Sequence, residues 1–376
     1  MELLAIPGPS GQEQAVVDYV VEQLRRAGAP AEAIQTDGAH RRSPYGGQTG
    51  NLVCRLAGSR RAPRRLLVAH LDTVPLCQGA LPVRRGRLIR PADGKTALGA
   101  DNRAGVAVVL ATALAILRHK LPHPPLTFLW TVQEEVGLCG ARYARLGLLG
   151  RPRLCFNFDG GSPEKITVGA TGGYRMVVRI HGRASHAGNA PEEGVSAIVV
   201  AAEAVTRLHQ EGWHGRVSRD GRAGTSNVGI IRGGDATNVV APRVELHAEA
   251  RSHDPTFRRQ IVRAIEQAFR HAARSVRNVR GQHAKVEIDG SMQYEAFKLP
   301  HDDPSTLAAE TAIRQTGGRP FRALANGGLD ANWLTARGLP TVSLGCGQRN
   351  AHTPGERLDV GQFRQACRVA LRLATL

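Results

Sequence analysis

Two adjacent glutamates, Glu134 and Glu135, follow the apolar segment LTFLWTV within the stretch LTFLWTVQEEVG at residues 126–137. Like charges side by side at the edge of a core disfavour each other unless a nearby cation offsets them. One carboxylate can coordinate such a cation, while the other accepts a proton from water and passes it to a leaving amine. The alternative is structural, because acids also favour the N-terminus of a helix, here one beginning at Val136.

A second pair of polar residues, His70 and Asp72, lies in the stretch RLLVAHLDTVP. Residues i and i+2 of a strand point to the same side, so the imidazole and the carboxylate converge. This arrangement suits a metal ligand whose tautomer and orientation are held by an acid behind it. An ordinary polar strand end would give the same pattern.

Three further candidates lie where predicted strands, loops and helices meet. Asp101, in LGADNRAG, comes just before a buried helix, where a carboxylate is also the usual helix cap. Asp159 ends the strand FNFD, and open α/β sheets bind their ligands at the carboxyl ends of strands. His352 lies in the turn-rich loop GQRNAHTPGE, where a lone histidine is more often simply exposed.

The set is more informative than any single member, because all its residues fall at predicted strand ends or turns of one domain. Histidines together with carboxylates suit zinc or a similar divalent ion. Two ions about 3.5–4 Å apart can share a hydroxide nucleophile and polarise a carbonyl. The sequence therefore predicts a site for two divalent ions, with zinc expected and cobalt or manganese as alternatives, drawn from His70, Asp101, Glu134, Glu135, Asp159 and His352.

The elements that position these residues have the pattern of a doubly wound α/β fold with a mostly parallel sheet. A long Ala-rich segment at 105–117 predicts a buried helix, and further helices are expected from Pro304 and Val360. Ser10 and Glu13 have the spacing of a capping box for a helix over 15–24. Strands with little polar alternation, as expected when both sheet faces are covered, are predicted at 51–56, 65–72, 126–132, 153–159 and 340–345.

The pattern changes near Gly172, where alternating strands begin. The β-α-β-β-α-β order that follows predicts a small α+β (ferredoxin-like) sheet with helices on one face. The simplest architecture is a catalytic domain of residues 1–171 and 291–376, interrupted by an inserted domain of residues 172–290. Its strands are predicted at 174–182, 225–234, 241–251 and 283–290, and its helices at 193–209 and 254–273.

The formal net charge of +18 invites comparison with nucleic-acid-binding proteins. Only five of the 50 basic residues are lysine, however, and the arginines are spread along the whole chain, as in a compositional bias. Aromatic residues make up 4% of the chain, too few to stack single strands, so no nucleic-acid partner is expected.

Cellular location is also predicted from composition. The six scattered cysteines contain no CxxC pair and indicate reduced thiols. The first residues lack the pattern of a signal peptide, and no apolar run approaches the roughly 18 residues of a membrane span. A soluble, cytoplasmic protein with no membrane partner is expected.

Seven stretches, in order, resemble the motifs of the co-catalytic zinc exopeptidase family. This family contains peptidase T, carboxypeptidase G and the acetylornithine deacetylase and succinyl-diaminopimelate desuccinylase enzymes. The resemblance covers nearly the whole chain, and GRASHAGNAPEEGVSAI, NGGLDANWL and HTPGE look most like the peptidase T-like branch. The seven stretches are VAHLDTVP, LGADNRAGVAVV, VQEEVGLCGAR, FNFDGG, GRASHAGNAPEEGVSAI, GGDATNVVAP and NAHTPGE.

The resemblance implies a place for each candidate metal ligand. Asp101 would bridge two metal ions. His70 and Asp159 would complete one site, and Glu135 with His352 the other.

The resemblance also implies that Glu134 is the general base and that Asp72 supports the first histidine ligand. The family has a cis peptide after the bridging acid, which would fall between Asp101 and Asn102. Most members carry a second Asp followed by Lys or Gly where this chain has Asn102 and Arg103. Because asparagine preserves size but not charge, a small change in metal affinity is expected.

The inserted domain would correspond to the family's lid and dimerisation domain, which implies a homodimer. His186 matches the histidine that reaches the active site, usually from the partner subunit, and stabilises the tetrahedral oxyanion. Asn238 and Arg251 match substrate-binding positions that are expected to face one cleft, with Arg251 suited to hold a carboxylate bidentately. Backbone from Gly327 and Gly328 would complete the carboxylate pocket. Without the motifs, His186 is an ordinary turn histidine and Arg251 one more surface arginine.

These observations favour a dimetal hydrolase that cleaves an amide bond next to a free carboxylate in short peptides. An N-acyl-amino-acid deacylase of the same family is the alternative, using the same water attack on a smaller acyl group. A non-catalytic basic binding protein is a third reading, and it is weakened because every ligand and base position is present.

Overall fold

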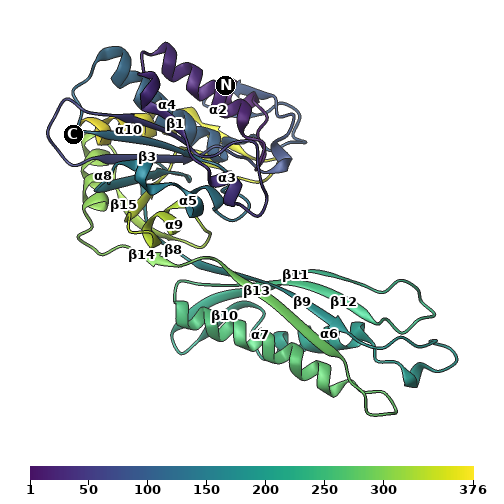
Figure 1. The fold of residues 1–376 in the computed structure, drawn as a ribbon. Helices are drawn as coiled ribbons and strands as arrows, with labels where there is room; N and C mark the ends of the chain where they lie inside the picture. The colour runs from purple at the N-terminus through teal and green to yellow at the C-terminus, as the bar shows by residue number, and fades with distance from the viewer. The chain divides into compact units, whose positions relative to one another are not determined.

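The computed structural model describes all 376 residues, which divide into two compact units (Figure 1). Unit 1 comprises Met1–Ala170 and Phe297–Leu376, and unit 2 comprises Thr171–Ala296. The inserted segment thus ends later than residue 290, because its last strand, β13 (Lys285–Tyr294), continues beyond the alternating apolar pattern.

Unit 1 is built on a nine-stranded mixed sheet. Its order is β1 (Ile34–Thr36), β2 (Leu52–Leu56), β6 (Leu126–Thr131), β3 (Arg65–His70), β7 (Leu154–Phe158), β16 (Thr341–Leu344), β8 (Lys165–Ala170) and β14 (Phe297–Lys298), with β15 (Phe321–Ala325) paired to β8. The four central strands β6, β3, β7 and β16 are parallel, and antiparallel pairs flank them on both sides. The predicted α/β fold with a mostly parallel central sheet is confirmed.

Both faces of this sheet are covered by helices, because alternate residues of the central strands enter different apolar clusters. On β3, Leu67 and Ala69 pack on one face, whereas Leu66 and Val68 pack on the other. The first face is covered by α2 (Gln14–Arg26), α4 (Ala100–His119), α8 (Pro304–Gln315) and α10 (Val360–Thr375), and the second by α5 (Cys139–Tyr143) and α9 (Asp330–Ala336).

Helix α4 is long and apolar enough to cross a membrane by length and composition alone, contrary to the expectation that no such segment exists. In the structure, 67% of its apolar window is buried inside the protein. The helix packs against α10, α2 and β3, so it serves as a core helix of unit 1.

A second, four-stranded sheet in unit 1 holds the loop that carries His352. Its order is β17 (Gln348–Arg349), β18 (Arg357–Asp359), β5 (Leu88–Pro91) and β4 (Pro82–Arg85). Because β17 and β18 pair antiparallel, the intervening residues 350–356 form the loop of a hairpin. Two one-turn helices, α1 (Glu2–Ala5) and α3 (Ala39–Arg42), complete the unit.

The predicted capping box at the start of α2 is wrong. The helix begins at Gln14, and no side chain accepts a hydrogen bond at its N-terminus. Ser10 and Glu13 instead direct their side chains to Asp72 and to the backbone of Gln133. The spacing was correct for a cap, but tertiary partners outcompete the local one.

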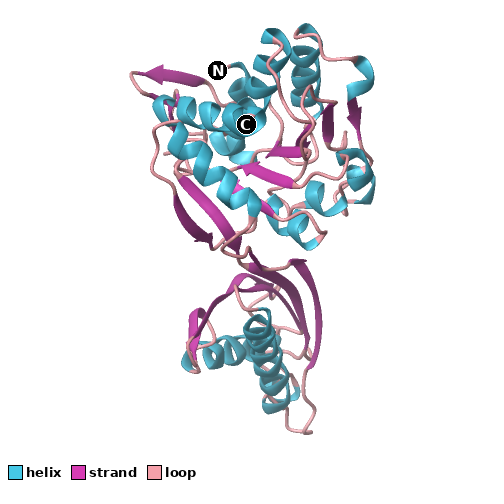
Figure 2. Cartoon of the chain, turned by 90° about the vertical axis from the view of Figure 1, so that its left-hand side faces the viewer, coloured by secondary structure: helices cyan, strands magenta, loops and turns pink.

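Unit 2 is a five-stranded antiparallel sheet with two helices against one face (Figure 2). Its order is β10 (Gly215–Arg219), β11 (Arg222–Gly233), β12 (Arg243–Ser252), β9 (Gly172–His181) and β13, and its helices are α6 (Ala197–Gln210) and α7 (Pro255–Ser275). Without β10 the order is that of the predicted β-α-β-β-α-β fold. Strand β10 was missed, although Asp220-Gly221 between β10 and β11 is a strong hairpin signal.

Candidate metal centre

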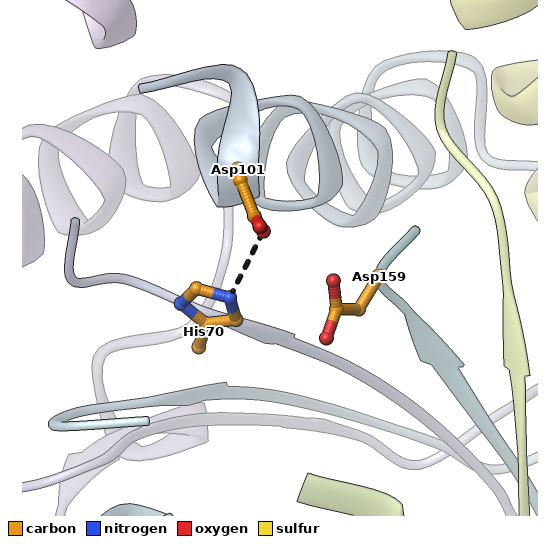
Figure 3. Close-up of side chains that lie close together, drawn as sticks. All are labelled: His70, Asp101 and Asp159. Atoms are coloured by element: carbon orange, nitrogen blue, oxygen red, sulfur yellow. Dashed lines mark ion pairs between the residues drawn. The ribbon is translucent and has the colours of Figure 1, made fainter. Parts of the chain in front are cut away.

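The candidate ligands of unit 1 gather where its parallel strands end, and Figure 3 shows three of them, His70, Asp101 and Asp159. His70 is the last residue of β3, and Asp159 directly follows β7. Glu134 and Glu135 follow β6 after a two-residue turn. Since parallel neighbours present their carboxyl ends at the same edge of a sheet, these side chains converge there.

Asp101 approaches this edge from the N-terminal turn of α4. Both Asp101 and Asn102 have non-helical backbone angles, and the peptide bond between them is cis, as the resemblance implied. The carboxylate caps no helical N–H. Its Oδ1 lies 3.4 Å from Nε2 of His70, and its Oδ2 lies 3.4 Å from Nε2 of His352. The structural alternative for Asp101, a helix cap, is therefore wrong.

The side chains form two groups that share Asp101. One group is His70, Asp101 and Asp159, and the other is Asp101, Glu135 and His352. Within each group, one ligand atom per residue lies within 4.8 Å of the others. A third group of the same size joins His70 to both glutamates.

Asp72 is fully buried and holds three parts of the site together. Its Oδ1 accepts a hydrogen bond from the backbone N–H of Glu134 at 2.9 Å, and its Oδ2 accepts one from that of Glu135 at 3.1 Å. Its Oδ2 also accepts the hydroxyl of Ser10 at 2.6 Å, and its Oδ1 lies 3.4 Å from Nδ1 of His70. Asp72 thus orients the glutamate pair as well as the histidine.

The two glutamates have different surroundings. Oε1 of Glu135 lies 2.8 Å from Nε2 of His352. The carboxylate of Glu134 makes no hydrogen bond or ion pair, although the residue is only 8% exposed. The helix-terminus explanation of the pair is wrong, because the next helix, α5, begins at Cys139 and residues 134–137 form a turn.

The crowded acids have shifted pKa values. Burial, reinforced by Asp101, raises the pKa of Asp159 to about 7. Burial raises the pKa of Glu134 well above its usual range, with Glu135 adding to the effect. Burial likewise raises the pKa of Glu135. Because ionising all of these groups together is unfavourable, the cluster requires compensating positive charge.

In the protein alone, this positive charge comes from protons on the histidines. Hydrogen bonds to Asp101 and then Glu135 raise the pKa of His352 to about 10. Burial opposes the charge on His70, but Glu134, Asp101 and Asp72 outweigh it and raise its pKa.

The donor set fits divalent metal ions in place of these protons. Oδ1 of Asp101 is buried and accepts no hydrogen bond, so it remains available to a metal ion. Imidazole nitrogen and carboxylate oxygen are ligands that zinc, cobalt and manganese share. Nδ1 of His70 lies 3.2 Å from the backbone oxygen of Asp72, which holds the proton on Nδ1 and leaves Nε2 free to bind.

Sequence reasoning missed several residues that hold the ligands in place. Glu356 is 1% exposed and accepts the backbone N–H groups of Gly99 and Asp101, both at 2.8 Å. Buried Asp330 accepts the hydroxyl of Thr131 at the end of β6. Both acids lie in motifs that were noted for other residues, HTPGE and NGGLDANWL, so the signal was present in the sequence.

Asn102, the residue that departs from the family pattern, is fully buried and makes two hydrogen bonds. Its Nδ2 donates to the backbone oxygen of Phe158 at 2.9 Å, and its Oδ1 accepts the N–H of Gly105 at 3.1 Å. An aspartate could not donate the first of these bonds. The residue therefore joins the start of α4 to the strand end that presents Asp159.

The remaining candidates divide between the units. Gly327 and Gly328 lie in unit 1, in the loop between β15 and α9. A Cβ added to Gly327 would meet no atom within 4 Å, so no close contact requires a glycine there. His186, Asn238 and Arg251 belong to unit 2.

His186 and Asn238 are neighbours within unit 2. The ribbon of β9 and β12 continues beyond their ends, with His186 bridged to Val239 and the N–H of Ala187 donating to the backbone oxygen of Asn238 at 2.9 Å. Nδ1 of His186 accepts the N–H groups of Gly188 and Asn189, at 3.1 and 3.2 Å.

Arg251 lies at the opposite end of this ribbon, where it pairs with Gly173 on β9. Arg251 lies eight residue steps along β12 from Arg243, which corresponds to about 27 Å at about 3.4 Å per residue. The expectation that Asn238 and Arg251 face one cleft of the same chain is therefore wrong. The guanidinium of Arg251 is bound bidentately by Glu249, with both distances 2.9 Å.

Comparison with known sequences gives consistent matches over most of the chain. The family model described as peptidase family M20/M25/M40 matches residues 66–376. The uncharacterized protein YqjE of Bacillus subtilis strain 168 is 31% identical over 314 residues, covering 84% of this chain and 81% of that protein. Peptidase T of Escherichia fergusonii is 28% identical over 298 residues, covering 77% of this chain and 68% of that protein.

Solved structures match over nearly the full length. A tripeptidase from Staphylococcus aureus has a TM-score of 0.88 and 30% identity, and the match covers 99% of this chain and 95% of that one. Aminopeptidase PepT from Bacillus cereus has a TM-score of 0.83 and 29% identity, covering 100% and 95%. A dinuclear metal-binding peptidase of family M20 from Bacillus subtilis, YxeP, shares the fold at 16% identity, with a TM-score of 0.68 and coverage of 99% and 94%.

Proposed function

Because this chain belongs to peptidase family M20/M25/M40, in its peptidase T-like branch, we propose that it is a dimetal exopeptidase acting on short peptides. The observation that carries the proposal is the pair of ligand groups sharing Asp101, with the unpaired carboxylate of Glu134 beside them. A tripeptidase and an aminopeptidase among its structural relatives support di- and tripeptides as substrates.

We propose that His70, Asp101 and Asp159 hold one divalent ion and that Asp101, Glu135 and His352 hold the other. When bound, such ions supply Lewis-acid activation of water and of the scissile carbonyl. Zinc is the proposed ion, and cobalt or manganese could occupy the same ligands.

Glu134 is the proposed general base. Its carboxylate lies among the ligands but is not engaged by His352, unlike that of Glu135. Burial raises the pKa of Glu134 and so makes its carboxylate a stronger base, which suits a group that takes a proton from water and delivers it to the leaving amine. Asp72 fixes the backbone from which this side chain extends.

His186 is the proposed donor to the oxyanion. Because its Nδ1 accepts two backbone N–H groups, the proton of the neutral ring resides on Nε2. Nε2–H is therefore free to donate to the negatively charged oxygen that forms when water attacks the carbonyl.

We propose a homodimer formed through unit 2, because His186 and Arg251 lie too far apart along one ribbon to bind the same small substrate. Strand β10 pairs with β11 only over Arg222–Ser226, so residues 227–233 of β11 present an open sheet edge. Ile231 on this edge is 58% exposed, and an open apolar edge favours pairing with another strand.

Mixed dimers would test this arrangement. His186→Ala and Arg251→Ala should each lower activity strongly. After the two variants are mixed and exchanged, half the dimers are hybrids with one complete site of two, so activity should return to about a quarter of wild type. No recovery, despite demonstrated subunit exchange, would contradict the shared site.

The proposed activity is tested with metal-loaded protein and a panel of free and end-blocked di- and tripeptides, analysed by mass spectrometry. Release of single residues from free peptides supports the proposal. Blocking each terminus in turn identifies the charge that the enzyme requires. Turnover of N-acetyl or N-succinyl amino acids alone would establish the deacylase alternative. Absence of bound metal and of any turnover with zinc, cobalt or manganese would favour a non-catalytic binding protein.

A further inference from the structure

The segment Ser10–Glu13, which precedes α2, contacts the catalytic region through two side chains. On the basis of the function proposed above, we infer that this segment is a brace that sets the position of Glu134, with Glu13 as a positioning residue. Glu13 does not belong to either ligand group. It acts through the backbone of Gln133, the residue that immediately precedes the base.

Glu13 is fully buried and bridges two segments of backbone. Its Oε1 accepts the N–H of Gly11 at 2.8 Å and the N–H of Gln133 at 3.0 Å. Its Oε2 is buried without a hydrogen-bond partner. Burying a carboxyl group with one oxygen unpaired costs free energy. We infer that this cost is tolerated because Glu13 holds the backbone of Gln133 in place.

Gln133 needs such control because its backbone is in the left-handed region, with φ of 54°. A non-glycine residue reaches this region only when its surroundings determine it. Its side chain is held on both sides, with Oε1 accepting the hydroxyl of Ser43 and Nε2 donating to the backbone oxygen of Gly46. Its backbone oxygen accepts the N–H of Cys139 at 3.0 Å. Every polar group of this fully buried residue is thus fixed.

The left-handed residue turns the chain so that the next two N–H groups point at Asp72. Ser10 donates to that same carboxylate. The brace therefore acts on the turn in two ways, through Asp72 and through the N–H of Gln133. The residues just before the brace are anchored as well, because the N–H of Thr73 donates to the backbone oxygen of Gly8 at 3.1 Å. Nη2 of buried Arg103 donates to the backbone oxygen of Ile6 at 3.3 Å.

The inference is tested with Glu13→Ala, Glu13→Gln and, as a matched control on the same helix region, Glu22→Ala, whose side chain is 52% exposed. Glu13→Ala removes the oxygen that accepts both N–H groups. It should lower kcat about 10²-fold, the cost that a 1 Å misplacement of a catalytic group can have, with KM unchanged within about twofold and metal content unchanged. Glu13→Gln keeps an acceptor oxygen and should restore most of kcat. Glu22→Ala should match wild type.

Three results would overturn the inference. The first is a wild-type kcat in Glu13→Ala. The second is a kcat in Glu13→Ala that falls only as much as its metal content or its folded fraction falls. The third is an equal loss of kcat in Glu13→Gln and Glu13→Ala. If Glu13→Ala does not fold, Ser10→Ala provides the second variant. It removes one of the bonds to Asp72 and should lower kcat about tenfold with metal retained, whereas an unchanged kcat would contradict the brace.

A structural measurement separates this inference from the proposed function. Hydrogen exchange of the segment 131–139 should be faster in Glu13→Ala than in wild type and unchanged in Glu22→Ala, whether or not any peptide is cleaved. Equal exchange in all three proteins would refute the brace. Failure of the wild-type protein to cleave any peptide would refute only the proposed function.

Discussion

The proposed division of labour between Glu134 and Glu135 gives the sharpest prediction about the site. The perturbation is Glu134→Gln compared with Glu135→Gln, since glutamine preserves the volume of the side chain and changes no backbone bond to Asp72. Because the carboxylate of Glu134 has no hydrogen-bond partner, replacing it breaks no hydrogen bond. It relieves repulsion from Glu135 and removes the attraction to His70, so the two effects oppose each other.

The expected magnitudes follow from these surroundings. Loss of a general base lowers kcat by about 10²–10⁴-fold, equivalent to about 2.7–5.4 kcal/mol of the barrier at about 1.36 kcal/mol per factor of ten. The free energy of unfolding of Glu134→Gln should change by no more than about 1 kcal/mol, the centre of the distribution for point mutants. Glu135→Gln instead weakens a proposed metal ligand that is grouped with Asp101 and His352, so bound metal should decrease.

The assay measures metal per chain by mass spectrometry after gel filtration, together with kcat on a tripeptide and urea unfolding. Glu134→Gln should retain two metal ions per chain with almost no turnover. Glu135→Gln should lose metal and recover part of its activity in excess zinc. Equal metal loss in both variants, or a kcat for Glu134→Gln within about tenfold of wild type, would refute the assignment.

The remaining predictions concern stability and the supporting residues. The chelated protein should lose stability as pH rises from about 6 to 8. The pKa values of Asp159, at about 7, and of His352, at about 10, are both raised in the folded protein. The folded state therefore binds more protons than the unfolded state over this range, and its stability falls as those protons are lost. Bound metal should flatten this dependence, and thermal melts at each pH with and without chelator check both slopes. Asn102→Asp should destabilise the protein by about 1–3 kcal/mol, because a carboxylate would face the backbone oxygen of Phe158, and an unchanged urea midpoint would contradict this. Glu356→Ala should weaken metal binding about 10–100-fold by freeing the N–H of Asp101, as measured by competition with a chromogenic chelator.

Much of the fold could be predicted from the sequence because apolar patterns encode it locally. The central strands of unit 1 are continuous apolar runs, as strands covered on both faces must be, and they were assigned close to their true bounds. The strand β10 was missed because it is short and mostly exposed, so no apolar pattern marks it. Its hairpin turn was the only signal.

The candidate ligands could be named from motifs, but their supporting partners could not. Residues as distant in sequence as Asp101 and His352 share a cluster because the start of α4 and the hairpin loop of β17 and β18 meet. In unit 2 the sequence suggested a convergence of two residues that the structure keeps apart. Sequence distance suggested that Asn238 and Arg251 converge, whereas the antiparallel register separates them.

The sequence by itself determined which chemical groups this protein has available and the elements that carry them, since residue type and periodicity are local properties. Only the tertiary structure decided what each group touches. Ser10 and Glu13 have the spacing of a helix cap, yet their side chains turn to Asp72 and Gln133. The adjacent glutamates look alike in sequence, yet the carboxylate of Glu135 pairs with His352 whereas that of Glu134 makes no hydrogen bond or ion pair. Such differences arise because burial and long-range hydrogen bonds exceed local preferences once the chain is packed.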